Sequence, residues 1–150
     1  MTVDRAYLQD IHDETKEEAA MSTQDDAEPS YRVLLVDDSR TMQKLTSGLL
    51  DRAGHQVTIA NTGEDALAAL KSDDAFDIVL MDVEMPGMDG LEATQRIRHV
   101  ESLSGRHTPI IGLTTIERDQ CLSAGMDGHL LKPATSKQLR ETIRRFLHAV

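Results

Sequence analysis

The sequence is poor in cysteine, since Cys121 is the only one among its 150 residues. No disulfide can therefore form within the chain, which fits a reducing compartment. The sequence also lacks an uninterrupted run of about 18 apolar residues, the length that a membrane-spanning helix needs. Its first 20 residues, MTVDRAYLQDIHDETKEEAA, lack the apolar core of a signal peptide. We expect a soluble, cytoplasmic protein.

Positive charge is scarce as well. The sequence has 16 lysine and arginine residues against 26 aspartate and glutamate residues, which gives a formal net charge of -10 at pH 7. Because such a chain repels polyanions, we do not expect it to bind nucleic acid or an anionic membrane surface directly. Its length is that of one domain, with room for a tail.

The first 30 residues differ in composition from the rest. They contain nine acidic residues against only Arg5 and Lys16, and they end in the polar, linker-like stretch STQDDAEPS. Four apolar residues have the spacing of a short amphipathic helix: Val3, Tyr7, Leu8 and Ile11. We therefore divide the chain into an acidic N-terminal segment (residues 1–30), which is either a solvated tail or a docking or dimerising helix, and a folded domain (residues 31–150).

From Tyr31 onward, apolar runs alternate with segments of helical periodicity. The apolar runs predict strands at 31–38, 55–60, 76–81, 108–115 and 128–132. The other segments predict helices at 39–54, 61–72, 89–102, 116–125 and 134–149. Because the strand runs are continuous, we expect both faces of the sheet to be covered and the strands to be parallel. The alternation predicts an α/β fold with one doubly wound, five-stranded parallel sheet.

Several predicted helices carry recognisable start and stop residues. Ser39 is placed to cap the first helix, Thr62 the second and Asp89 the third, while Gly54 is placed to end the first. Two helices carry an apolar stripe: Met42, Leu45 and Leu49 in the first, and Leu139, Ile143, Phe146 and Leu147 in the last. Gly48 costs the first helix about 1 kcal/mol. We expect it to permit close approach, either of the sheet or of a partner.

Polar residues gather at the carboxyl ends of the predicted strands. Asp37 and Asp38 end the first strand, Asp82 follows the third, Thr114 lies near the end of the fourth, and Lys132 ends the fifth. In a parallel sheet these ends share one edge, where binding sites form. If the first and third strands are neighbours, three carboxylates converge there and repel one another unless a cation lies between them. An all-oxygen ligand set favours Mg²⁺ over zinc, and the six histidines show no paired metal-ligand spacing.

Lys132 and Thr114 indicate the chemistry of this edge. A carboxylate can attack phosphorus and form an aspartyl phosphate. That transfer requires in-line placement and neutralisation of charge on the phosphoryl oxygens. Mg²⁺, the Lys132 ammonium group, and the Thr114 hydroxyl together with backbone amides would each hold one of these oxygens. The residues therefore predict that Asp82 is phosphorylated.

Four stretches of the sequence resemble the receiver domain of two-component response regulators: LLVDDS, VLMDVEMPGMDGLEATQRIR, PIIGLT and AGMDGHLLKP. The resemblance runs from about Tyr31 to Ala149 and is greatest to the receivers of hybrid kinases and phosphorelays. It implies the flavodoxin-like strand order 2-1-3-4-5. It also implies that Asp38 and Asp82 bind Mg²⁺ directly, with Asp37 acting through water and Glu84 through its backbone carbonyl. A cis peptide before Pro133 is implied as well.

The family's switch is matched only in part. In receivers the residue matching Thr114 moves toward the phosphoryl group, and an aromatic residue on the fifth strand turns inward behind it. The matching position here is His129, which either rotates in the same way or is a tolerated substitute on a surface strand. Between Thr114 and Cys121 the chain is about one helical turn shorter than the family pattern. Thr115 also replaces the small residue that usually follows the switch threonine, so we expect the output surface to differ.

The resemblance implies a signalling role rather than an enzyme, apart from self-catalysed phosphotransfer and autodephosphorylation. We expect a stand-alone receiver, without an output domain, that takes its phosphoryl group from a sensor histidine kinase or a histidine phosphotransfer protein. In this family the first helix is the usual docking surface for such donors. Signalling would follow by contact with a downstream protein or by phosphorelay. The alternatives are a constitutive protein-binding adaptor with an uncoupled switch, and a hydrolase using Asp82, for which the short loops provide no substrate pocket.

Overall fold

The computed structural model describes residues 29–72, 76–115 and 118–147. Within these residues, strands and helices alternate as predicted. The strands are β1 (Arg32–Val36), β2 (Gln56–Ala60), β3 (Ile78–Asp82), β4 (Ile110–Thr114) and β5 (Gly128–Leu131). The helices are α2 (Arg40–Arg52), α3 (Gly63–Ser72), α4 (Gly90–Ser102), α5 (Arg118–Ala124) and α6 (Ser136–Leu147). The short helix considered within residues 1–30 lies outside the described part of the chain.

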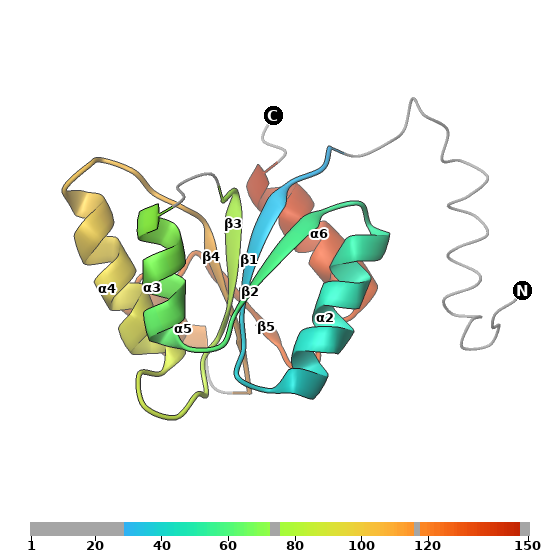
Figure 1. Ribbon diagram of the computed structural model, residues 1–150, viewed down its shortest axis with the longest axis horizontal. Helices are drawn as coiled ribbons and strands as arrows, with labels where there is room; N and C mark the ends of the chain where they lie inside the picture. The colour runs from blue at the N-terminus through green and yellow to red at the C-terminus, as the bar shows by residue number, and fades with distance from the viewer. Residues whose placement is uncertain (1–28, 73–75, 116–117, 148–150) are drawn as a thin grey trace, which may run out of the picture.

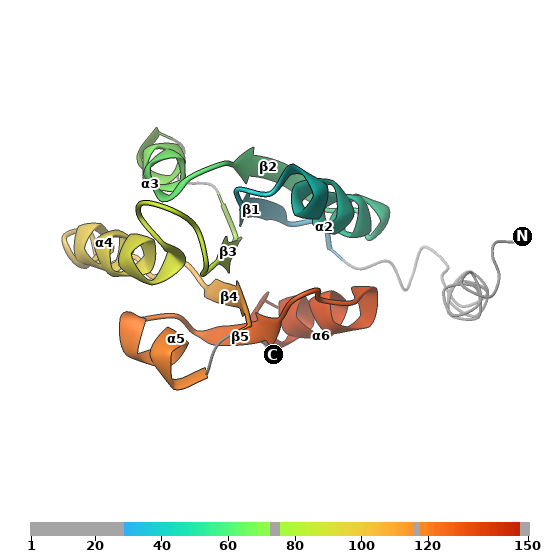
Figure 2. The same ribbon diagram turned by 90° about the horizontal axis from the view of Figure 1, so that it is seen from below.

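The strands form one parallel sheet in the order β2-β1-β3-β4-β5. Figure 2 shows α3, α4 and α5 on one face of this sheet and α2 and α6 on the other. The α/β prediction, the doubly wound parallel sheet and the strand order implied by the resemblance are all confirmed. After β1 the chain forms β2 on one side of it and then crosses to form β3 on its other side. The carboxyl ends of β1 and β3 therefore lie at the switch point of the sheet. This edge is at the bottom of Figure 1, where α2 and α4 begin.

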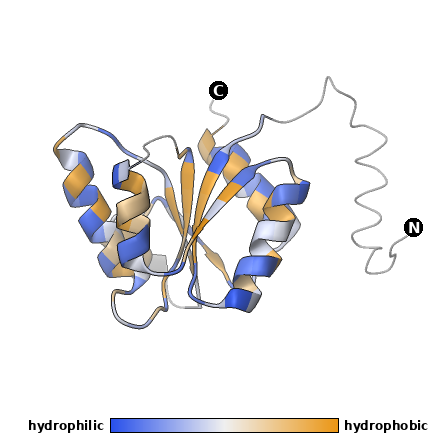
Figure 3. Cartoon of the chain, viewed as in Figure 1, coloured by the Kyte–Doolittle hydropathy of each residue, from blue (hydrophilic) through white to orange (hydrophobic). Residues whose placement is uncertain are grey.

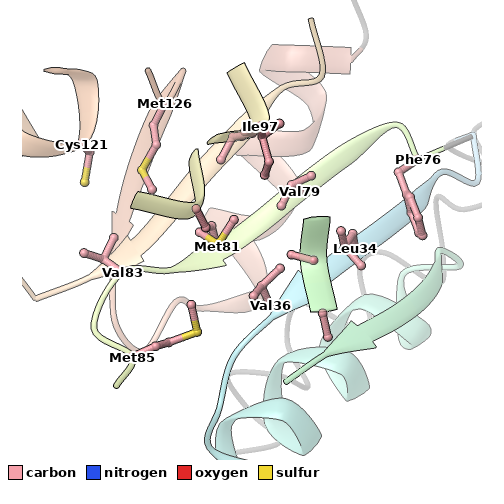
Figure 4. Close-up of a cluster of buried hydrophobic side chains, with 14 residues drawn as sticks. Leu34, Val36, Phe76, Val79, Met81, Val83, Met85, Ile97, Cys121 and Met126 are labelled. Carbon is pink, nitrogen blue, oxygen red and sulfur yellow. The ribbon is translucent and has the colours of Figure 1, made fainter. Parts of the chain in front are cut away.

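Alternate side chains of the inner strands enter two apolar layers. The layer toward α3, α4 and α5 includes Leu34, Val36, Val79 and Met81 (Figure 4). The layer toward α2 and α6 includes Val33, Leu35, Ile78 and Leu80, together with Leu139 and Ile143 of the predicted α6 stripe. The strands at the centre of Figure 3 are accordingly coloured mostly as apolar residues. None of the helices within the described residues is long and apolar enough to cross a membrane.

Helices cover both faces of the sheet, as expected, but the two edge strands keep exposed apolar residues. On β2, Ile59 is 40% exposed, and on β5, Leu131 is 58% exposed. Each edge strand pairs with a neighbouring strand on one side only, so its outer side is left open (Figure 2). The three inner strands, by contrast, are buried along almost their whole length. The buried centre therefore holds β1, β3 and β4, whose ends carry the acidic and hydroxyl residues of interest.

The apolar stripe of α2 is less buried than its spacing suggests. Leu45 is 46% exposed, whereas Gln43 and Thr46 are buried beside Leu50. The reason is local, because the Gln43 side-chain amide donates hydrogen bonds of 2.7 Å to the backbone carbonyl of Asp37 and of 2.7 Å to the side chain of Asn61. A polar side chain thus ties α2 to the loops at the carboxyl edge of the sheet, and the stripe turns partly toward solvent.

Gly48 does not pack closely on the sheet, contrary to one of the two explanations considered for it. The nearest atom that a Cβ at this position would meet is the Arg52 guanidinium nitrogen, 4.0 Å away. Because the site is open and helical, Gly48→Ala is expected to raise the free energy of unfolding by about 1 kcal/mol. Chemical denaturation of the two proteins would measure this difference. A destabilised variant would show that another group approaches Gly48 in solution.

Candidate functional site

Asp37 and Asp38 lie where β1 passes into α2. The Asp37 Oδ1 atom accepts a hydrogen bond of 2.9 Å from the backbone N–H of Ser39. The Ser39 hydroxyl in turn accepts a bond of 3.2 Å from the N–H of Met42, which confirms Ser39 as the helix cap. The start of the helix therefore fixes the turn that carries the two aspartates. Asp37 is 1% exposed, whereas Asp38 faces solvent.

Asp82 is the last residue of β3 and is 1% exposed. Its backbone position is set by the sheet, because the next residue, Val83, donates a hydrogen bond to the carbonyl of Leu113 at 3.0 Å and accepts one from the N–H of Gly90 at 2.9 Å. The chain then enters α4, whose cap Asp89 accepts a bond of 2.8 Å from the N–H of Glu92. The Asp82 carboxylate therefore lies at the end of β3, where the sheet ends and hydrogen bonds to Val83 hold the turn that follows.

The carboxylates of Asp37, Asp38 and Asp82 converge. Each offers one oxygen atom, and the three atoms all lie within 4.8 Å of one another. Asp37 Oδ2 is buried without a hydrogen-bond partner within the described residues. Oxygen atoms so crowded, with one buried acceptor unused, fit a hard divalent cation of the Mg²⁺ type. The cluster that the strand ends predicted is therefore present as a geometric arrangement.

The electrostatics of the cluster agree with this fit. Burial raises the pKa of Asp82 to about 6; the hydrogen bond from Lys132 opposes this shift, and the neighbouring charge of Asp37 adds to it. Burial likewise raises the pKa of Asp37, although the hydrogen bond from Ser39 partly offsets it. The raised pKa values of these two buried carboxylates show that the positive charge near them does not fully neutralise their negative charges. A bound cation would supply that charge.

Lys132 reaches Asp82 from the far side of the cluster. It follows β5, and its ammonium nitrogen lies 2.8 Å from Asp82 Oδ1 and 3.2 Å from Glu84 Oε1. The Lys132–Pro133 peptide bond is cis, as the resemblance implied. Burial acts to lower the pKa of Lys132, but the hydrogen bond and charge of Asp82 and the contact with Glu84 outweigh it, so the pKa is raised. Lys132 is thus held as a cation beside Asp82.

Thr114 ends β4 and is fully buried. Its hydroxyl donates a hydrogen bond of 2.9 Å to Glu84 Oε2. The resemblance implied a role for the backbone carbonyl of Glu84 and placed Glu84 and Thr115 near the site, but it did not indicate this side-chain contact. Burial acts to raise the pKa of Glu84, yet hydrogen bonds from the Thr115 N–H, the Thr114 hydroxyl and Lys132 lower it overall. The one sequence clue was the position of Glu84, two residues after Asp82.

His129 lies apart from this group. It is half-buried on β5 and pairs in register with Gly112, whereas the register partner of Thr114 is Leu131. The helix between β4 and β5 is short, since α5 has seven residues. Residues 116 and 117 of the shortened segment lie outside the described residues. The structure therefore brings together Asp37, Asp38, Asp82, Glu84, Thr114 and Lys132.

Comparison with known proteins gives concordant matches. A family model described as the response regulator receiver domain matches residues 33–144. The sensor histidine kinase RcsC of Salmonella typhi is 40% identical over 129 residues, which cover 83% of this chain and 13% of the kinase. The probable histidine kinase 4 of Oryza sativa subsp. japonica is 35% identical over 137 residues, which cover 77% of this chain and 14% of the kinase. The chain thus spans only a small part of the curated relatives that it matches.

One solved structure with the same fold contains a metal ion. It is the receiver domain of the sensor histidine kinase PA1611 from Pseudomonas aeruginosa, with magnesium coordinated in its active-site cleft. Its TM-score to this chain is 0.72 at 33% identity, and the match covers 81% of this chain and 100% of that chain. A chain in the co-crystal structure of the Saccharomyces cerevisiae phosphotransfer protein Ypd1 with the receiver domain of Ssk1 gives a TM-score of 0.73 at 25% identity, covering 79% and 89%.

Proposed function

The chain belongs to the response regulator receiver domain family, and from this premise we propose that it accepts a phosphoryl group on Asp82. The observation that carries the proposal is the environment of the Asp82 carboxylate. Its Oδ1 atom is 2.8 Å from the Lys132 ammonium group. The Asp82 carboxylate also contributes an oxygen atom to the cluster with Asp37 and Asp38. A nucleophilic oxygen lies there between groups that can neutralise a transferred phosphoryl group.

The phosphoryl donor is a phosphohistidine. One Asp82 oxygen attacks phosphorus, a P–O bond forms, and the P–N bond to the imidazole breaks. The departing imidazole nitrogen keeps the bonding electrons and takes up a proton from solvent. Lys132 balances charge on one phosphoryl oxygen, and the Thr114 hydroxyl with nearby backbone amides balances charge on another. Asp82 must be ionised to attack, and burial raises its pKa to about 6 in the metal-free chain, so a bound cation would also favour the reactive carboxylate form.

Mg²⁺ is the proposed cofactor. Asp38 and Asp82 would hold it directly, Asp37 through water, and Glu84 through its backbone carbonyl. The crowded oxygen atoms and the unused Asp37 acceptor support this assignment. The magnesium ion in the PA1611 receiver supports it by analogy. When bound, the cation offsets the repulsion between the carboxylates and lowers the barrier for an anionic phosphoryl group to approach them.

The proposed donor protein is a sensor histidine kinase or a histidine phosphotransfer protein. The match to the Ypd1–Ssk1 structure and to histidine kinases supports this choice. The partly exposed stripe of α2, with Leu45 46% exposed, offers an apolar surface for docking. Residues 31–150 form the receiver unit in this proposal, with Thr114 and His129 as its switch. A cytoplasmic location is favoured by the single cysteine.

The signal would pass on by contact with a downstream protein or by phosphorelay. We propose that the protein does this as a stand-alone receiver, which the size of the native polypeptide in its cells would test. The seven-residue α5 favours one alternative, a constitutive adaptor whose switch is uncoupled. Binding of a downstream partner that depends on phosphorylation supports the receiver. Binding that is equal with and without phosphorylation supports the adaptor.

Intact-mass measurement after incubation with acetyl phosphate tests the phosphoacceptor proposal. The expected result is one added phosphoryl group per chain, present with Mg²⁺, absent without it, and mapped to Asp82 by peptide analysis. In that reaction the P–O bond to acetate breaks and acetate leaves. A folded sample that gains no phosphoryl group from acetyl phosphate or from phosphohistidine proteins would reject the proposal and leave the adaptor.

A further inference from the structure

The carboxylate of Glu84 makes contacts that the proposed function does not use. Glu84 Oε2 accepts hydrogen bonds from the Thr114 hydroxyl at 2.9 Å, the Thr115 backbone N–H at 3.1 Å and the Thr115 hydroxyl at 3.1 Å. Glu84 Oε1 lies 3.2 Å from the Lys132 ammonium nitrogen. One side chain from the loop after β3 thus engages the end of β4 and the residue that follows β5.

These contacts involve the same donors that phosphoryl transfer to Asp82 requires. The proposed function assigns Lys132, the Thr114 hydroxyl and nearby backbone amides to the phosphoryl oxygens. The Glu84 carboxylate contacts these donors and, like a phosphoryl group, carries negative charge. It lies next to the nucleophile, since Lys132 also contacts Asp82 at 2.8 Å. We propose that the Glu84 carboxylate is an internal stand-in for the phosphoryl group, which holds these donors until phosphorylation displaces it. The inference rests on the proposed function.

The side chain is placed to leave without disturbing the site. Glu84 is 36% exposed, whereas Lys132 is 20% exposed and Thr114 is fully buried. Rotation of the Glu84 side chain into solvent would release all four donor groups while its backbone stays in place. The Glu84 N–H donates to Asp82 Oδ1 at 3.2 Å, so the backbone has its own attachment to the site. Displacement therefore needs a side-chain rotation and no rearrangement of the sheet.

The residue after the switch threonine takes part in this contact. Thr115 provides both its N–H and its hydroxyl to Glu84. An alanine at this position would keep the N–H bond and lose the hydroxyl bond. Thr115 and Glu84 therefore form a pair whose effects should not be additive. In unphosphorylated protein this pair connects the end of β4 to the loop after β3. A phosphoryl group on Asp82 would make the same connection through its own hydrogen bonds.

Occupied donors must lower the apparent affinity for any phosphoryl group or analogue. The apparent affinity equals the intrinsic affinity multiplied by the fraction of molecules in which the donors are free. The probe for this effect is beryllofluoride, titrated into the full chain with saturating Mg²⁺. If Glu84 occupies the donors in about nine molecules of ten, Glu84→Ala should bind the probe about tenfold more tightly than the unmodified chain. Glu84→Gln loses the charge but keeps an acceptor oxygen, so its gain should be smaller. Thr115→Ala should produce a smaller gain, and no gain in the Glu84→Ala background.

Glu141→Gln is the matched control. It removes the same charge from an exposed position on α6, so it should leave beryllofluoride affinity unchanged. A second measurement requires no ligand: amide hydrogen exchange at Thr115 should be faster in Glu84→Ala, because its N–H loses its acceptor. If the unmodified chain binds beryllofluoride and the Glu84 variants bind it no more tightly, the proposal that Glu84 stands in for the phosphoryl group is overturned. The phosphoacceptor proposal then remains intact. Absence of both probe binding and phosphorylation in the unmodified chain would overturn both.

Discussion

Asp82→Asn is expected to abolish phosphorylation and, at the same time, to stabilise the protein at neutral pH. The chemical effect follows because an amide oxygen cannot act as the nucleophile that forms an acyl phosphate. No phosphoryl group should be added by acetyl phosphate with Mg²⁺, in intact-mass spectra recorded beside the unmodified chain. Retained modification on a different residue would show that Asp82 is not the acceptor.

The stabilising effect follows from the pKa of Asp82. Burial raises this pKa from an ordinary value of 3.8 to about 6. At a pH above 6 the carboxylate is ionised in both the folded and the unfolded chain, and the folded state bears the cost of the buried charge. The shift corresponds to about 3 kcal/mol as an upper bound. Asparagine has the same shape, carries no charge and keeps an oxygen that can accept from Lys132, so it removes this cost.

The pH dependence gives this prediction its sign. In buffer without Mg²⁺, the Asp82→Asn variant should exceed the unmodified chain in free energy of unfolding by about 2 to 3 kcal/mol above pH 6. The difference should shrink as the pH falls from 6 and should vanish below 3.8, where Asp82 of the unmodified chain is protonated in both the folded and the unfolded state. Urea denaturation at several pH values measures it. Asp51→Asn, at an exposed position on α2, is the control and should change stability by less than about 0.5 kcal/mol. A destabilised Asp82→Asn would mean that Lys132 already compensates the charge.

The fold could be predicted from the sequence because its signals are local. Apolar runs specified the buried strands, and the caps Ser39, Thr62 and Asp89 were found to bond the expected N–H groups. The candidate site could be predicted for a related reason. Parallel strands place their carboxyl ends at one edge, so residues far apart in sequence meet there without any further information. The strand order itself came from the resemblance, because periodicity does not specify which strands are neighbours.

Side-chain pairings across the fold could not be predicted in this way. The resemblance placed the Glu84 backbone at the site, but only the folded chain places its side chain against Thr114 and Lys132. Arg98 is a second case at the opposite edge of the sheet. Its side chain is 18% exposed, and its guanidinium group bonds Glu101, Asp127 and the carbonyls of Thr108 and Gly125, which joins α4 to the residues before β4 and β5. The Arg98–Glu101 pair has the i,i+3 spacing of a helix, but no sequence spacing encodes the contacts with Asp127, Thr108 and Gly125.

Gly90→Ala is expected to have the largest effect on stability among the substitutions considered. A Cβ at Gly90, the first residue of α4, would lie 2.3 Å from the backbone oxygen of Asp82 and 2.8 Å from the Cα of Val83. Both obstacles are backbone atoms, so no side-chain rotation can relieve the overlap. Either α4 moves away from the sheet or the end of β3 moves. The free energy of unfolding should fall by about 3 kcal/mol or more, which chemical denaturation would measure.

The same substitution should slow phosphorylation, because the obstructing atom belongs to Asp82 itself. A displacement of about 1 Å at a reacting group can lower a rate by about 100-fold, so a comparable loss is expected under conditions where the variant stays folded. Gly48→Ala makes the same chemical change at an open helical position, with its nearest neighbour 4.0 Å away, and should leave phosphorylation unchanged. If Gly90→Ala were as stable and as reactive as the unmodified chain, α4 could shift freely relative to β3. The position of Asp82 would then depend on the sheet alone rather than on the tight turn that follows it.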